Sequence, residues 1–297
     1  MKKRLILSLV AVFLLIVLAA CSKPSSSNNS SNSSNDDLSG KVIAGGSTAL
    51  QPLAQQAATE FMVKHPKVQL TVQGGGSGVG LTQVAAATFQ VGNSDIFAEE
   101  KPGIDSSALK DYKVAVVGIA PIVNAESSVS ELTQDQLVDI FTGKITNWKE
   151  VGGKDLKITV ISRTEGSGTR VNFDKFALKN QAEITGPSQD ASGAVVTMVG
   201  QTPGAVSYVA FSYLQTSKDI KAVQIDGVEA SAANVASNKW KIWAYEHMYT
   251  NSKKETAVDK AFIDYVKSDK KNLEKMGYIA ISDMKVDRDA SGLVSNK

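Results

Sequence analysis

Three times in this chain, a short apolar segment runs into a turn rich in glycine, serine and threonine, and then into a helical pattern. The turns occupy residues 45–48, 74–78 and 163–169. The order strand, turn, helix predicts an α/β protein with mainly parallel sheets. In such folds ligands bind beyond the carboxyl ends of the strands, where these turns lie.

Hydrophobic spacing supports this assignment. Alternating or continuous apolar residues predict strands over residues 41–44, 68–72, 113–123 and 157–161. Apolar residues three and four positions apart predict helices over residues 50–62 and 171–177, and a further helix reaches residues 84–85. Thr133 and Gln136 form a capping-box pattern, which predicts another helix start.

The turns also carry groups suited to binding an anion. Helix N-termini offer free backbone N–H groups and the positive end of a dipole. The third turn adds the guanidinium of Arg163 and the hydroxyls of Ser167 and Thr169, and arginine suits bidentate contact with an oxyanion. Alternatively, each turn is only a capped surface turn, because Ser and Thr are common N-caps.

Asp95 gives this anion site a possible selectivity. A buried carboxylate repels an anion unless a proton lies between them. Protonated phosphate supplies that proton, whereas sulfate at neutral pH has none, so an acceptor here would select protonated oxyanions. The alternative is that Asp95 merely caps the turn that follows it.

Signatures of catalysis are absent from the sequence. None of the turn serines lies in a Gly-x-Ser-x-Gly elbow, and neither Gly-Lys pair is followed by the Ser or Thr of a P-loop. The two histidines, His65 and His247, are expected to be structural. No Cys/His cluster suggests zinc or copper, so we expect neither catalysis nor a cofactor.

The N-terminus predicts export and anchoring. A basic segment at residues 2–4 precedes an apolar run over residues 5–18, and small residues precede Cys21, the only cysteine. This arrangement resembles a bacterial lipobox, which implies cleavage before Cys21 and lipidation of that residue, including palmitate. The alternative is a plain membrane anchor with a buried cysteine. Residues 21–39, rich in Ser and Asn, are expected to form a disordered tether after a signal peptide at 1–20.

Charge argues against a nucleic-acid partner. Without Lys2, Lys3 and Arg4, 29 basic residues stand against 30 acidic ones. A chain this close to neutral has no broad basic surface for nucleic acid.

Together the turns resemble a known family. The motifs are Gly-Ser-Thr-Ala-Leu-Gln-Pro at 46–52, Gln-Gly-Gly-Gly-Ser-Gly at 73–78, Gly-Asn-Ser-Asp at 92–95 and the run at 163–169, with support from 140–148 and 203–208. In this order they resemble the substrate-binding lipoproteins of phosphate ABC transporters. The resemblance implies the two-lobed periplasmic-binding-protein fold (type II) with a hinged cleft. Lobe one would comprise 40–120 plus 243–297, and lobe two 121–242.

The resemblance also implies the ligand contacts. The residues expected to contact phosphate are Ser47, Thr48, Ala49, Ser77, Asp95, Arg163, Ser167, Gly168 and Thr169. Glu165 is expected to orient Arg163. The protein would be a monomer on the extracytoplasmic face of the cell membrane. There it would capture inorganic phosphate and deliver it to an ABC permease.

Two other functions stay open at this point. A phosphate-ester hydrolase on a similar scaffold would need a nucleophile or metal cluster near the turns. A surface adhesin or signalling lipoprotein would explain the anchor but not the Arg/Ser/Thr/Asp combination.

Overall fold

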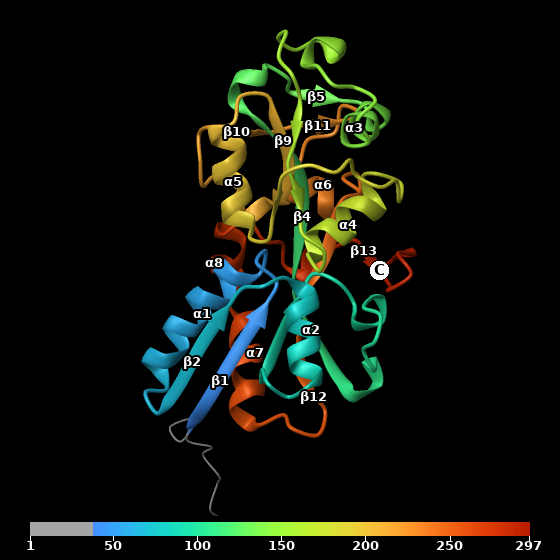
Figure 1. The fold of residues 1–297 in the computed structure, drawn as a ribbon. Coiled ribbons are helices and arrows are strands. Elements are labelled where there is room, and N and C mark those ends of the chain that lie inside the picture. Colours follow the sequence, from blue (N-terminus) through green and yellow to red (C-terminus); the bar gives the residue numbers. More distant parts are fainter. Residues whose placement is uncertain (1–37) are drawn as a thin grey trace, which may run out of the picture. The chain divides into compact units, whose positions relative to one another are not determined.

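The computed structural model describes residues 38–297 (Figure 1). The predicted signal peptide, Cys21 and nearly all of the predicted tether lie outside the described residues. The helices are α1 (Gln51–Lys64), α2 (Ser77–Ala85), α3 (Gln134–Phe141), α4 (Gly168–Phe176), α5 (Ser192–Gln201), α6 (Ala232–Ala236), α7 (Ala257–Ser268) and α8 (Lys270–Lys275). The strands are β1 (Gly40–Gly46), β2 (Val68–Gln73), β3 (Val91–Ser94), β4 (Leu109–Asn124), β5 (Glu131–Leu132), β6 (Thr159–Val160), β7 (Ser162–Arg163), β8 (Ser188–Gln189), β9 (Ala205–Ala210), β10 (Ile220–Ala222), β11 (Gln224–Ile225), β12 (Trp243–Asn251), β13 (Val286–Arg288) and β14 (Val294–Asn296).

The main sheet is mixed, with strand order β2-β1-β3-β12-β4-β9-β6 and β10 paired to β4. β1 is parallel to β2 and β3, and β6 is parallel to β9. β12 runs antiparallel to β3 and β4, and β4 runs antiparallel to β9. The prediction of mainly parallel sheets is therefore wrong for the centre of the sheet. The predicted α/β class is confirmed.

β4 explains the mixture, because it links two groups of elements. Its first part, from Leu109 to Gly118, pairs with β12, and its second part, from Ile119 to Val123, pairs with β9. Figure 1 shows β4 passing from the group that contains β1 and β2 to the group that contains β9 and β10. Each group has its own large set of buried apolar side chains. The exact lobe boundaries at 120/121 and 242/243 stay a prediction.

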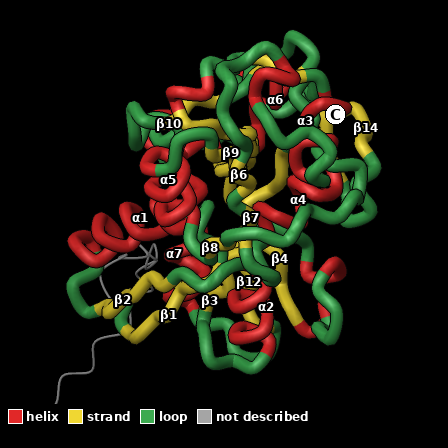
Figure 2. The backbone as a smooth tube through the Cα atoms, turned by 45° about the horizontal axis from the view of Figure 1, so that its top comes forward, coloured by secondary structure: helices red, strands yellow, loops and turns green. Residues whose placement is uncertain are grey.

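Helices cover both faces of the β1–β3 region. α1 and α7 pack together on one face, where the rings of Phe61 and Phe262 meet edge to face at 5.7 Å. α2 lies on the other face (Figure 2). It buries Leu81 and Val84 in a separate cluster. Leu38, from the predicted tether, packs against the first cluster. In the part of the chain that the structure describes, no helix is both long and apolar enough to span a membrane.

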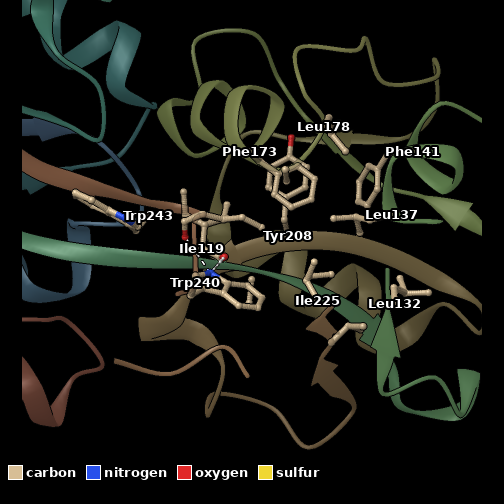
Figure 3. Packing of buried hydrophobic residues seen from close by; sticks show 14 of the residues in the cluster. Ile119, Leu132, Leu137, Phe141, Phe173, Leu178, Tyr208, Ile225, Trp240 and Trp243 are labelled. Atoms are coloured by element: carbon tan, nitrogen blue, oxygen red, sulfur yellow. Dashed lines mark hydrogen bonds between the residues drawn. The ribbon is translucent and has the colours of Figure 1, made fainter. Parts of the chain in front are cut away.

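Aromatic packing fixes the start of α4. Phe173 of α4 stacks on Tyr208 of β9 with ring centroids 4.0 Å apart and an interplanar angle of 11°, and Phe141 packs against both rings (Figure 3). Such buried aromatic pairs contribute about 0.5–1.5 kcal/mol beyond their area burial. This packing places the first residues of α4, which belong to the third predicted turn, against the sheet.

Candidate functional site

The first two turns and Asp95 meet at one edge of the sheet. β1, β2 and β3 are parallel neighbours, so their carboxyl ends lie together. Ser47 and Thr48 follow β1, Ser77 follows the turn after β2, and Asp95 follows β3. All four side chains are buried.

Ser47 organises the start of α1. Its Oγ accepts hydrogen bonds from the backbone N–H groups of Ala49 and Leu50, both at 3.1 Å. The Ala49 N–H, expected to contact phosphate, is thus directed at Ser47 in this structure. The local geometry is that of a serine satisfying free N–H groups before a helix.

Arg163 reaches this edge from the second group of elements. It ends β7, which pairs in parallel with β8, and its side chain is only 1% exposed. Its Nη2 donates to Thr48 Oγ1 at 3.2 Å and to the Asp190 carbonyl at 2.7 Å. Nε donates to the Gln189 carbonyl at 3.2 Å, and Nη1 donates to Ser192 Oγ at 3.3 Å. The guanidinium therefore joins Thr48 to the start of α5.

Burial and a nearby carboxylate act on this guanidinium in opposite directions. Removal from water lowers the pKa of Arg163, whereas the Asp95 carboxylate favours the charged form. An arginine keeps its charge in a protein even so. The site thus holds one buried cation aimed at the Thr48 hydroxyl.

Asp95 forms hydrogen bonds with residues from both groups. Thr169 Oγ1 donates to Asp95 Oδ2 at 2.8 Å, and the Asp95 backbone N–H donates to Ser77 Oγ at 2.9 Å. Asn172, on α4, donates from Nδ2 to the carbonyls of Asp95 and Gly168 at 2.8 and 2.9 Å. Asp95 Oδ1 is buried and has no hydrogen-bond partner among the described residues.

The two sides approach each other very closely. The Gly78 N–H donates to the Gly166 carbonyl at 2.9 Å. A Cβ placed on Gly168 would lie 2.2 Å from Ser77 Oγ and 3.0 Å from Asp95 Cβ. Only a glycine permits this approach, because a side chain would collide with both residues. Ser167, just before it, caps α4 by accepting from the Arg170 N–H at 3.3 Å.

One predicted residue lies apart from the rest. Glu165 is exposed, and the hydrogen bonds of the Arg163 guanidinium go to Thr48, Gln189, Asp190 and Ser192 instead. Backbone carbonyls from the β8–α5 turn thus orient the guanidinium in this structure. The role expected for Glu165 stays a prediction.

The sequence reasoning missed Ser192, Asn172 and Glu246. Ser192 begins α5 after the short strand β8, which makes a fourth strand–turn–helix unit. The run Asp190-Ala-Ser-Gly before an apolar segment carried that signal. Asn172 lies one turn into α4 and showed no pattern of its own. Glu246 lies within an aromatic stretch and showed no pattern of its own.

Catalytic groups do not gather at these turns. Over residues 38–297, no cluster of three or more His, Cys, Asp or Glu could hold a metal ion. His247 is buried, and its Nδ1 lies 2.7 Å from Asp111 Oδ1 on β4. The site combines one buried guanidinium, several hydroxyl groups and one buried carboxylate.

The fold and this site define a ligand-binding protein of the type II periplasmic-binding-protein architecture. The family model of the PBP superfamily domain matches residues 30–270. The phosphate-binding protein PstS of Bacillus subtilis is 49% identical over 257 residues, covering 86% of this chain and 85% of that protein. PstS of Borreliella burgdorferi is 26% identical and covers 81% of this chain and 90% of its own.

A solved structure agrees with these sequence relatives. A Clostridium perfringens chain, described as a phosphate ABC transporter substrate-binding protein with bound phosphate, aligns with a TM-score of 0.76 and 31% identity. The alignment covers 82% of this chain and all of that one. The present chain belongs to the PBP superfamily and, within it, to the family of PstS phosphate-binding proteins.

Proposed function

We propose that this protein captures inorganic phosphate outside the cytoplasm and delivers it to an ABC permease. The observation that carries the proposal is the buried Arg163, which meets Thr48 across the two groups of elements. The B. subtilis and C. perfringens relatives described above are both named as phosphate-binding or phosphate-transport proteins. No bond of the ligand is made or broken in this function.

Binding would exchange internal hydrogen bonds for bonds to the ligand. In this structure Arg163 donates a hydrogen bond to Thr48, and Thr169 donates one to Asp95. An oxyanion entering between them would take bonds from Arg163, Thr48, Ser77, Thr169 and nearby backbone N–H groups, while Asp95 would accept its proton. Hinged opening and closing of the two lobes would admit and enclose the ion.

Phosphate binding is tested by thermal unfolding and titration calorimetry on the purified protein. A ligand at 100 times its Kd stabilises the folded state by about 2.7 kcal/mol, so phosphate should raise the melting temperature in metal-free buffer and sulfate should not. Absence of any phosphate-induced shift would contradict the proposal. Turnover of a phosphate ester would favour the hydrolase alternative.

We also propose that the mature chain is held at the cell membrane by lipid on Cys21. The lipobox-like run before Cys21 supports this anchor, and two acyl chains are enough for stable attachment. Cys21→Ser should release the protein into the medium or leave it unprocessed, as read by fractionation of cells. A processed, acylated Cys21→Ser protein in the membrane fraction would refute the anchor.

A further inference from the structure

A carboxyl group outside the predicted site is fully buried beside Asp95. Glu246 lies on β12 and is 0% exposed. Both of its side-chain oxygens, and Asp95 Oδ1, have no hydrogen-bond partner among the described residues. β12 pairs antiparallel with β3, and His247 lies opposite Ser94, so the next positions along the two strands, Glu246 and Asp95, are neighbours. Three buried carboxyl oxygens therefore lie close together without a hydrogen-bond partner among the described residues.

Two adjacent carboxylates in such a place cannot both be ionised. Burial, followed by the neighbouring Asp95 charge, raises the pKa of Glu246 well above its usual range. Asp95 has a donor, Thr169, and its charge interacts with the buried Arg163. Because Asp95 already has a donor and Glu246 has none, we assign the proton of the pair to Glu246.

Other polar groups near Glu246 form hydrogen bonds with other partners. Tyr213 and Tyr278 lie close enough for its charge to act on them. Their hydroxyls donate to the carbonyls of Thr48 and Ala49, at 2.8 and 2.5 Å. The next residue on β12, His247, bonds to Asp111. Within residues 38–297, no lysine, arginine or histidine forms a salt bridge with Glu246.

We propose that Glu246 is a neutral acid whose O–H group donates to Asp95 Oδ1 and keeps Asp95 ionised as the acceptor of the ligand's proton. One proton between the two side chains satisfies Asp95 Oδ1 and uses the Glu246 hydroxyl. Glu246 is then a positioning residue that sets specificity through Asp95. This inference rests on the proposed phosphate-binding function.

Loss of the donor has a defined consequence for selectivity. A hydrogen bond to a charged group is worth a roughly 10- to 150-fold change in the equilibrium that it supports. Without the bond, the negative charge on Asp95 loses part of its stabilisation. Sulfate is then rejected less strongly, so the selectivity for phosphate falls.

The test compares Glu246→Gln with Glu246→Leu. The amide N–H of glutamine replaces the donor, whereas leucine removes it. Phosphate and sulfate titrations at neutral pH and fixed ionic strength measure the selectivity of each variant. Glu246→Gln should keep the sulfate-to-phosphate selectivity within about threefold of that of the unaltered protein. Glu246→Leu should lower the selectivity for phosphate by roughly tenfold or more.

Asp259→Asn provides a matched control. Asp259, on α7, is another buried carboxyl with one unpartnered oxygen, Oδ1, and it lies on an element that carries no site residue. This variant should leave the selectivity between phosphate and sulfate unchanged.

Three results would overturn the proposal. Sulfate binding by Glu246→Gln at neutral pH would mean that Glu246 carries the charge and Asp95 the proton. An unchanged selectivity in Glu246→Leu would make Glu246 a packing residue. The third result comes from the infrared difference spectrum between the ligand-free unaltered protein and Glu246→Gln, which does not depend on the folding of Glu246→Leu. This spectrum should show the loss of one protonated-carboxyl band, and the absence of that loss would overturn the proposal. Failure of the unaltered protein to bind phosphate would instead refute the proposed function.

Discussion

The charged groups at the two ends of the site differ in how many hydrogen bonds they make. At one end the Arg163 guanidinium makes four hydrogen bonds, to Thr48, Gln189, Asp190 and Ser192. At the other end Asp95 and Glu246 share three buried oxygens without a partner. A satisfied cation is rigid and preorganised, so it suits affinity. The interactions of a carboxyl pair with three unpartnered oxygens depend on where protons lie, so the pair suits discrimination between oxyanions.

Removal of the cation should have the largest effect. Arg163→Ala deletes a charged hydrogen-bond donor worth about 1.5–3 kcal/mol, which corresponds to a loss of roughly 10- to 150-fold in phosphate affinity. Calorimetric titration of the folded variant measures this loss. Lys179→Ala, which removes an exposed positive charge paired with Asp135, controls for net charge alone. An unaltered phosphate Kd in Arg163→Ala would mean that phosphate affinity comes from the Asp95–Glu246 end of the site, which would contradict the comparison.

Loss of the close contact between Gly168 and Ser77 should lower phosphate affinity nearly as much. Gly168→Ala places a Cβ 2.2 Å from Ser77 Oγ, and overpacking of this kind costs about 1–3 kcal/mol, or roughly 5- to 150-fold in affinity. The matched control is Gly193→Ala, since a Cβ there meets only Tyr213 Cε1 at 3.8 Å and should change phosphate affinity by less than about threefold. Equal Kd values for the two variants would show that this contact is not needed for binding.

Asp174 and Glu183 form a second carboxyl pair, outside the site, and its effect on stability should be the smallest of those predicted. Burial and the Glu183 charge raise the pKa of Asp174 to about 7, against the opposing charge of Arg170. Between about pH 4 and pH 7 the folded state therefore binds a proton that the unfolded state releases. Stability should fall as pH rises through this window.

Asp174→Asn should flatten that slope by less than about 1 kcal/mol in total, because Asp174 is only half-buried and solvent screens its charge. Unfolding midpoints at pH values across the window measure it. The selectivity between phosphate and sulfate should not change. A change in selectivity with a flat stability profile would mean that this pair, rather than Asp95 and Glu246, controls discrimination.

The sequence predicted the turns better than it predicted the sheet. Glycine-rich turns after β1 and β2 and the capping box at Thr133 are local signals, and the structure has α1, α2 and α3 at those positions, with the Thr133 cap hydrogen bonds present. Strand direction is not local. β4 and β12 run antiparallel to their neighbours, and only long-range pairing decides that.

The missed site residues have the same physical origin. β7 and β8 are two residues long, too short for an alternating pattern, so the Ser192 turn was not recognised. Glu246 is a charged residue in a buried strand, and its role depends on Asp95, which lies about half the chain away in sequence. Only the folded structure brings the two carboxyl groups together.

The most direct measurement of the central claim is the ratio of sulfate to phosphate affinity in the unaltered protein and in Asp95→Asn. Asparagine keeps the size of the side chain, removes the charge that repels sulfate and adds a donor. At neutral pH and fixed ionic strength, selectivity for phosphate should fall by at least roughly tenfold, about 1.4 kcal/mol, with only a modest loss of phosphate affinity. An unchanged ratio would contradict the account, because Asp95 would then be a cap or a packing residue and discrimination would arise elsewhere.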